Sequence, residues 1–201
     1  MPPGETLSPL LGRWAVSGYG LGSIPFGLIM SERMGLGNLR DIGSGNIGAT
    51  NVLRTGNKGA AAATLLLDAL KGAVAVLLAR VISGEDAAQL AALSAMLGHC
   101  FPVWLGFKGG KGVATFFGVI FALSYPVGIA CGLCWIFAVA VTRQSSMGAL
   151  MAASLSTIWV FALGEPRMFF LGVFLTMLIF WRHWPNVQRL REGTEPKIGQ
   201  S

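Results

Sequence analysis

The longest polar interval of the chain, residues 40–58, reads RDIGSGNIGATNVLRTGNK. Glycines allow turns with positive φ and bring backbone N–H groups close to a bound group. Successive N–H groups can form a concave anion site, and a helix beginning near Ala49 would add the positive end of its dipole. Because Arg40, Arg54 and Lys58 flank the turn, a phosphate is the favoured ligand. The alternative is a surface loop that uses glycine for turning and arginine for solubility.

The same interval contains the dinucleotide-binding pattern G-x-G-x-x-G at residues 43–48, with Asp68 near the position of a ribose-binding acid. That fingerprint requires a preceding strand within a βαβ unit. The upstream residues instead form an apolar span typical of a helix, and Asp68 lies inside another such span. The pattern therefore does not predict a Rossmann domain.

A second glycine-rich segment, KGGKG at residues 108–112, follows an apolar run. Position 105, where a Walker A sequence needs its first glycine, is leucine, so no nucleotide-cleaving loop is predicted. Two lysines among three glycines favour a second anion site, because a lysine ammonium acts as a point charge beside closely approaching backbone. The alternative is an ordinary basic flank that orients a membrane helix.

A third polar segment begins at residue 182 with RHWPNVQRLREG. Arg182, His183, Asn186 and Arg189 recur at helical spacing if Pro185 occupies an early helix position. They would then share one polar face close to the membrane surface. The alternative role is a basic anchor for lipid headgroups.

The elements that position these segments are apolar helices. Apolar residues make up 53% of the chain and charged residues only 12%, with a mean hydropathy of +0.63. Such a chain cannot cover itself with polar side chains, so we predict one integral membrane domain over residues 1–201. Residues 1–13 lack a basic segment followed by a cleavage site, so the first apolar run is expected to be retained.

The predicted fold class is an all-α polytopic membrane bundle. If the three basic segments all lie on the same side of the membrane, the chain must cross the membrane an even number of times between each of them. Residues 112–141 must then form two short crossings, broken near Pro126. Seven spans result, and the positive-inside rule then places the loops and the C-terminal tail in the cytoplasm. Six spans, with the tail outside, is the alternative. The spans are expected at residues 10–30, 59–81, 87–107, 112–141 as two crossings, 147–163 and 168–181.

Two charged residues, Asp68 and Lys71, lie within the predicted span at residues 59–81. They are three positions apart and share a helix face, so they are expected to form an ion pair that supports the site. A direct role in substrate or proton handling is the alternative. Gly18 and Gly22, at small-x-x-x-small spacing in the first span, predict close helix packing.

Three motifs carry a family resemblance: GSGNIGATN at residues 43–51, GHCFPVWLGFKGGKGVAT at 98–115 and RHWPNVQRL at 182–190. Their order and spacing resemble those of the bacterial acyl-phosphate:glycerol-3-phosphate acyltransferase family. The resemblance implies a multi-pass inner-membrane enzyme of phospholipid synthesis with a cytoplasmic site. It would transfer a fatty acyl group from acyl phosphate to the 1-hydroxyl of glycerol 3-phosphate, yielding lysophosphatidic acid and phosphate. Its expected partners are these two substrates and membrane lipid, and no nucleic acid is expected to bind.

The site expected on this basis holds two phosphate groups. Acyl phosphate would occupy the turn at residues 43–51, and glycerol 3-phosphate would be held by Arg54, Lys108, Lys111 and the Asn186 region. The catalytic candidates are Ser44, Arg54, Lys111 and His183. The binding candidates are Gly43, Gly45, Asn46, Gly48, Thr50, Asn51, His99, Lys108, Gly109, Gly110 and Asn186.

Several points of mechanism stay open. The general base could be His183, His99, Asp68 or a substrate phosphate oxygen, and Ser44 could instead act as a covalent nucleophile. Acyl phosphate has a good leaving group, and no acidic cluster faces the loops, so neither a cofactor nor a metal ion is expected. An organic-phosphate transporter is the alternative function, although its site would be expected near the membrane midplane.

Overall fold

The computed structural model describes residues 7–199, and the regular structure in that range is helical. The expectation about a signal peptide rests partly on residues 1–6, which lie outside the described range. Short 3₁₀ turns occur at Leu39–Asp41, Val103–Leu105 and Pro166–Met168. The α-helices are α1 Leu7–Gly22, α2 Phe26–Arg33, α3 Ala49–Leu53, α4 Lys58–Ser83, α5 Glu85–Cys100, α6 Val113–Leu123, α7 Tyr125–Thr142, α8 Ser145–Ala162, α9 Phe169–Arg182 and α10 Trp184–Arg191.

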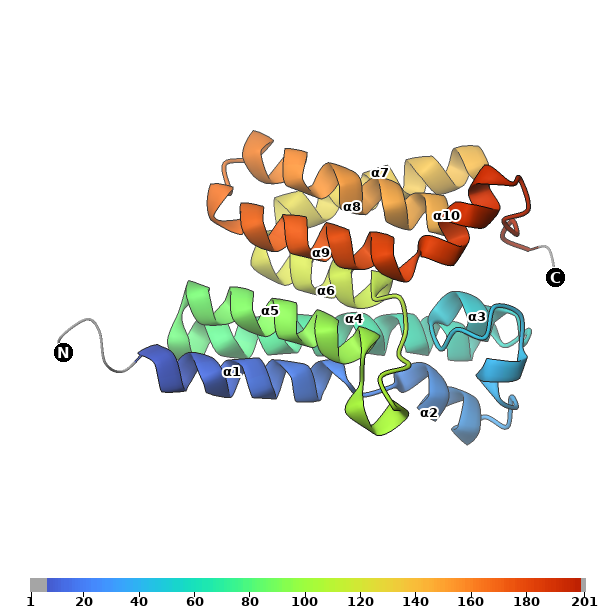
Figure 1. Ribbon diagram of the computed structural model, residues 1–201, viewed down its shortest axis with the longest axis horizontal. Helices are drawn as coiled ribbons and strands as arrows, with labels where there is room; N and C mark the ends of the chain where they lie inside the picture. The colour runs from blue at the N-terminus through green and yellow to red at the C-terminus, as the bar shows by residue number, and fades with distance from the viewer. Residues whose placement is uncertain (1–6, 200–201) are drawn as a thin grey trace.

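The long helices run back and forth along one axis (Figure 1). Helices α1, α4 and α5 form one group, α7, α8 and α9 form another, and α6 lies between them. The short helices α2, α3 and α10 gather at one end of the bundle, together with the loop that joins α5 to α6. The three polar motifs are therefore brought to the same end.

The span predicted at residues 10–30 is wrong as one continuous helix, because it breaks between Gly22 and Phe26 into α1 and α2. Pro25 has no N–H to donate and disfavours helical geometry at the preceding residue. The break frees the carbonyl of Ile24, which accepts a hydrogen bond from the Lys71 ammonium at 2.7 Å. A lysine on α4 thus satisfies the backbone that the proline interrupts.

The apolar stretch at residues 112–141 does divide in two, as predicted. Helix α6 ends at Leu123 and α7 begins at Tyr125, with Pro126 in its first turn. The 11 residues of α6 extend about 16 Å at 1.5 Å per residue, which is short of the roughly 30 Å hydrocarbon core.

Close packing at Gly18 and Gly22 is confirmed. A Cβ added at Gly18 would lie 2.7 Å from the carbonyl oxygen of Ala91, and one at Gly22 would collide with the backbone of Ala95. Helices α1 and α5 therefore touch backbone to backbone, as small residues permit in membrane bundles.

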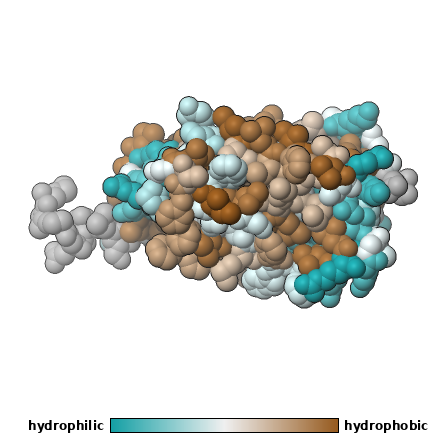
Figure 2. Space-filling model, turned by 90° about the horizontal axis from the view of Figure 1, so that it is seen from above, coloured by the Kyte–Doolittle hydropathy of each residue, from teal (hydrophilic) through white to brown (hydrophobic). Residues whose placement is uncertain are grey.

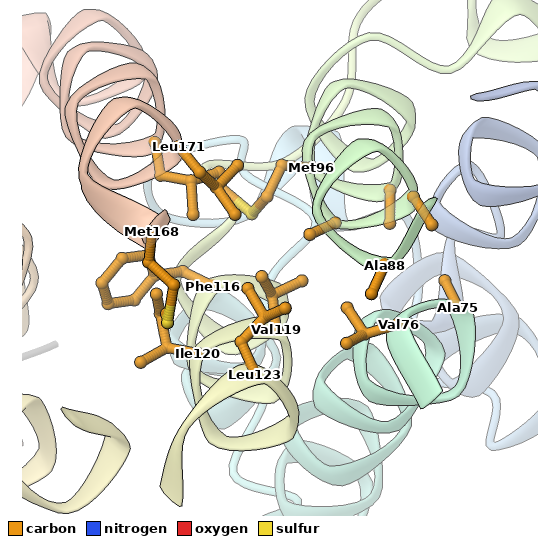
Figure 3. Close-up of a cluster of buried hydrophobic side chains, with 14 of the residues drawn as sticks. Ala75, Val76, Ala88, Met96, Phe116, Val119, Ile120, Leu123, Met168 and Leu171 are labelled. Carbon is orange, nitrogen blue, oxygen red and sulfur yellow. The ribbon is translucent and has the colours of Figure 1, made fainter. Parts of the chain in front are cut away.

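The main core lies where α4, α5, α6 and α9 meet, around side chains such as Val76, Met96, Phe116 and Ile120 (Figure 3). Apolar side chains also cover much of the outer surface between the two ends, and the right-hand end of the view is strongly hydrophilic (Figure 2). Within residues 7–199, three helical segments are long and apolar enough to cross a membrane, or four if the bent pair α9–α10 is counted. This distribution is that of an integral membrane protein.

Candidate active site

The three polar motifs share one cavity of about 450 Å³ at the hydrophilic end of the bundle. Two arginines, a lysine and two tryptophans line it together with residues of the first-motif turn. The lining residues are Arg40, Ser44, Gly45, Asn46, Gly109, Lys111, Trp181, Arg182, Trp184 and Pro185. Residues far apart in the sequence thus converge on a single cationic hollow, as the motifs predict.

The turn of the first motif has the predicted geometry. Gly43 and Gly45 adopt positive φ values of +53° and +66°, and α3 begins at Ala49. A Cβ at Gly43 would lie 2.7 Å from Cδ of Arg54, so this glycine lets the Arg54 side chain approach the turn. The guanidinium of Arg54 has no hydrogen-bond partner in the described part of the chain and is free to meet a ligand.

Asn51 organises this turn from within. Its Nδ2 donates to the carbonyls of Leu39 at 2.9 Å and Ile42 at 3.0 Å, and its Oδ1 accepts from the backbone N–H of Ser44 at 3.2 Å. Because its amide is buried and engaged, Asn51 supports the turn. Asn46 accepts from the N–H of Gly48 at 2.9 Å through Oδ1, which leaves its Nδ2 for a ligand.

Of the predicted site residues, Ser44, Gly45, Asn46, Gly109 and Lys111 line the cavity, whereas the others do not: Gly43, Gly48, Thr50, Asn51, Arg54, His99, Lys108, Gly110, His183 and Asn186. Thr50 is exposed at the start of α3. His99 is a buried residue of the second motif; its carbonyl accepts from the N–H of Gly110 at 3.0 Å and its ring packs against that glycine.

The second motif holds its glycine N–H groups in internal bonds. Gly109 donates to the carbonyl of Cys100 at 3.1 Å, and Gly110 donates to that of His99. These two glycines therefore allow close backbone packing and do not offer their N–H groups to a ligand. The positively charged group that the motif contributes to the cavity is Lys111. Lys108 is exposed at the rim of the site.

Lys111 connects the second motif to the third. Its ammonium donates to Oδ1 of Asn186, at the start of α10, over 2.6 Å. Burial lowers the pKa of Lys111 to about 8, and the positive charges of Arg189, Arg54 and Arg182 add to that effect while Glu195 opposes it. The ammonium is consequently poised to lose its proton just above neutral pH.

Glu195 completes the third motif and was missed by the sequence reasoning. Its carboxylate accepts hydrogen bonds from Asn186 at 2.6 Å, Ser146 at 2.7 Å and Arg189 at 2.7 Å. Burial raises the pKa of Glu195, but these hydrogen bonds lower it by more, so the group stays ionised. The only signal in the sequence is an acid within a basic tail, which does not by itself reveal these partners.

His183, the joint between α9 and α10, is buried beside Asn186. Its Nδ1 lies 2.9 Å from the carbonyl of Ile179. A carbonyl only accepts, so Nδ1 carries the proton and Nε2 of the neutral ring is left as an acceptor.

The Asp68–Lys71 pair forms as predicted, with 2.6 Å between Lys71 Nζ and Asp68 Oδ1. His99 Nδ1 lies 3.7 Å from the same carboxylate oxygen. This buried cluster lies away from the cavity and meets the second motif through His99 and through Thr115, whose hydroxyl donates to the Asp68 carbonyl at 2.9 Å. Across residues 7–199, no group of three or more His, Cys, Asp or Glu side chains is arranged to hold a metal ion.

The fold and the site together define an integral membrane protein with a cationic, phosphate-suited cavity at one end of a helical bundle. Residues 13–193 match the family model described as glycerol-3-phosphate acyltransferase. The chain belongs to this family.

Relatives and solved structures agree with that assignment. The glycerol-3-phosphate acyltransferase of Ruegeria pomeroyi is 66% identical over 200 residues, which cover 100% of this chain and 98% of the relative. That of Roseobacter denitrificans is 61% identical over 98% of each chain. The fold is similar to a crystal structure of PlsY, an integral membrane glycerol 3-phosphate acyltransferase, in its glycerol 3-phosphate form, with a TM-score of 0.89 and 37% identity over 94% of this chain and 96% of that one. The lysophosphatidic acid form of PlsY gives a TM-score of 0.86 at 35% identity.

Proposed function

We propose that this protein transfers a fatty acyl group from acyl phosphate to the 1-hydroxyl of glycerol 3-phosphate, producing lysophosphatidic acid and inorganic phosphate. One observation carries the proposal: all three motifs contribute to a single cationic cavity at the end of an apolar bundle. Such a cavity can meet a polar phosphate from the aqueous side and an acyl chain from the bilayer. Family membership supports the same reaction.

Acyl phosphate is placed with its phosphate against the turn at residues 43–51. Ser44 and Asn46 line the cavity there, and a serine hydroxyl and an amide nitrogen can both donate to phosphate oxygens. Gly43, Gly45 and Gly48 give the turn its shape, while Asn51 holds it from behind.

Glycerol 3-phosphate is assigned to Arg54 and Lys111, with Lys108 at the rim. Arg54 and Lys111 lie close enough for the arginine to lower the pKa of the lysine. A phosphate dianion between them would relieve that repulsion and fix the glycerol hydroxyl relative to the acyl carbonyl.

The chemical step follows as direct displacement. The 1-hydroxyl oxygen forms a bond to the acyl carbon, the bond from that carbon to the phosphate oxygen breaks, and phosphate leaves with its electron pair. The hydroxyl proton passes to Nε2 of His183 or to a phosphate oxygen. His183, His99 and Asp68 are all buried and none of them lines the cavity. Burial also lowers the pKa of His183 to about 4, so a phosphate oxygen is the better suited acceptor.

A transporter remains the alternative function, and the Asp68–Lys71 pair is the observation that favours it, since charges at membrane depth often mark a translocation path. In the present proposal this pair supports the site through His99, whose carbonyl accepts from the N–H of Gly110.

The proposed topology has seven crossings in one domain of the bacterial inner membrane, with the motifs and the tail in the cytoplasm. The alternating directions of α1, α4, α5, α6, α7, α8 and α9 support this count (Figure 1). It is tested with single cysteines at Glu85, Lys108 and Lys197 in a cysteine-free protein. An impermeant maleimide applied to right-side-out vesicles should label only the first, and labelling at 197 would support six crossings.

The activity is tested with purified protein in lipid, radiolabelled glycerol 3-phosphate, and either palmitoyl phosphate or palmitoyl-CoA as donor. Labelled lysophosphatidic acid is expected from palmitoyl phosphate alone. Lys111→Gln should abolish most of it, whereas Arg33→Gln, at an exposed arginine of α2, should not. Uptake of unmodified glycerol 3-phosphate into sealed vesicles, without product from either donor, would favour the transporter.

A further inference from the structure

Two arginines hold three successive backbone carbonyls of the second motif. Arg182 donates from Nε to the carbonyl of Gly110 and from its terminal nitrogen to that of Gly109, each at 3.0 Å. Arg40 donates to the preceding carbonyl, that of Lys108. We call the carbonyls of residues 108–110 the carbonyl strip. The residue that follows the strip is Lys111.

The N–H groups on the other side of the same segment are hydrogen-bonded as well. The N–H groups of Gly109 and Gly110 donate to the carbonyls of Cys100 and His99 at the end of α5. The segment is therefore fixed to α5 through its N–H groups and to the two arginines through its oxygens. Both glycines are buried, and a side chain at either would collide with His99.

Arg40 also reaches the first motif, since its other terminal nitrogen donates to the carbonyl of Gly45 at 3.3 Å. One guanidinium thus joins the turn that carries Ser44 and Asn46 to the segment that carries Lys111. The orientation of Arg182 is set separately, because its guanidinium lies over the ring of Phe101, 5.2 Å from the centroid.

We infer that Arg40 and Arg182 are positioning residues: they fix the carbonyl strip and so set the place of Lys111 relative to the Ser44–Asn46 turn. The inference rests on the proposed function and deepens it. A guanidinium suits this role because its planar fork can donate to two carbonyls at once, which the single ammonium of lysine reproduces poorly. A residue that only supplied positive charge to a phosphate would tolerate lysine far better.

The first test compares Arg40→Gln, Arg40→Lys, Arg182→Gln and Arg182→Lys by steady-state kinetics. Each is expected to raise the KM for glycerol 3-phosphate about tenfold or more, with a smaller change in kcat, because the misplaced group is the proposed ligand of that substrate. The lysine variants should behave like the glutamine variants. Wild-type KM values in both lysine variants would overturn the inference, since charge alone would then suffice.

The double variant Arg40→Gln/Arg182→Gln supplies a second kinetic criterion. Both residues act on one strip, so the double variant should raise KM by clearly less than the product of the single effects. If the fold-increase in KM of the double variant equalled the two single fold-increases multiplied together, the two arginines would act independently, which would contradict the inference. Arg33→Gln is the matched control and should leave KM unchanged, because Arg33 is exposed and ends α2, a helix at the same end of the bundle.

Hydrogen exchange tests the strip without relying on catalysis. Loss of the Arg182 bonds should speed exchange of the Gly109 and Gly110 amides about tenfold in Arg182→Gln, with no change in Arg33→Gln. Unchanged exchange overturns the positioning role. The two ideas fail separately. If the wild-type protein made no lysophosphatidic acid while exchange at Gly109 and Gly110 still increased in Arg182→Gln, the proposed function would be wrong and the structural role of the arginines would stand.

Discussion

The amide of Asn186 bridges two opposite charges of the site. Its Oδ1 accepts from the Lys111 ammonium at 2.6 Å, and its Nδ2 donates to the Glu195 carboxylate at 2.6 Å. An amide can satisfy both partners only in this orientation, because its oxygen accepts and its nitrogen donates. Glu195 thereby turns the oxygen of Asn186 towards Lys111.

Replacing Asn186 with alanine removes both bonds at once. Hydrogen bonds to charged groups are worth about 1.5–3 kcal/mol each, so Asn186→Ala should lower kcat/KM by at least about tenfold while the protein remains folded. Initial rates with both substrates varied, together with a melting curve, would measure this.

Gln188→Ala is the matched control for Asn186, because Gln188 is an exposed amide on the same helix, α10. It should retain wild-type kcat/KM. Equal losses in the two variants would point to a general weakening of α10 and contradict a specific role for the Asn186 amide.

The lowered pKa of Lys111, about 8, predicts a pH dependence. If the cation holds a phosphate, kcat/KM should fall as pH rises through about 8, since this parameter reports groups of the free enzyme. Lys111→Arg should move that limb to higher pH, because arginine stays protonated. A pH–rate profile in which the limb stays near pH 8 in the variant would assign it to another group.

The pKa of Lys111 should also make stability depend on pH, but stability should rise with pH where kcat/KM falls. Between the folded pKa of about 8 and the ordinary lysine value of 10.5, the unfolded chain binds more protons at Lys111 than the folded chain does. Its contribution to the free energy of unfolding therefore increases with pH across that window. Comparing the pH dependence of melting in wild-type protein and Lys111→Met would isolate this contribution.

Ser44 distinguishes direct displacement from covalent catalysis. Ser44→Ala should fold normally, since the serine hydroxyl makes only a long 3.4 Å contact with Asn51, yet transfer should fall severely through loss of a donor to acyl phosphate. Mass spectrometry of wild-type protein quenched with palmitoyl phosphate should find no acyl group on Ser44. An acyl-enzyme at that position would replace direct displacement with a two-step mechanism.

Gly22→Ala tests the contact between α1 and α5. An added Cβ would lie 2.6 Å from the Ala95 carbonyl carbon, so the helices must separate, at a cost of about 1–3 kcal/mol typical of overpacking. Gly12→Ala, on the same helix with nothing within 4 Å, should be neutral. Thermal unfolding in detergent would compare them, and equal melting temperatures would contradict the packing argument.

The sequence predicted the site best where the chemistry is local. Positive φ at Gly43 and Gly45, the helix start at Ala49 and the Asp68–Lys71 pair each depend on neighbours a few positions away. The division of residues 112–141 was also predicted, because a proline near the middle of a long apolar run limits the possible helices.

The features that the sequence did not reveal depend on distant partners. The three hydrogen bonds of Glu195, from Ser146, Asn186 and Arg189, join α8, α10 and the tail, and no spacing rule connects these positions. Asn51 was assigned to substrate because its neighbours suggest a phosphate turn, but its amide faces the carbonyls of Leu39 and Ile42. The break at Pro25 was missed because the surrounding residues are continuously apolar.

Backbone contact between helices also bears on how the enzyme would accommodate a fatty chain. Gly22 lies against Ala95, and Gly118 lies against Ala69, where an added Cβ would be 2.6 Å from the carbonyl carbon. At these two positions a fatty chain cannot pass between the helices without separating α1 from α5 or α4 from α6. The chain would then lie along the lipid-facing exterior there, in contact with the hydrocarbon of the host bilayer.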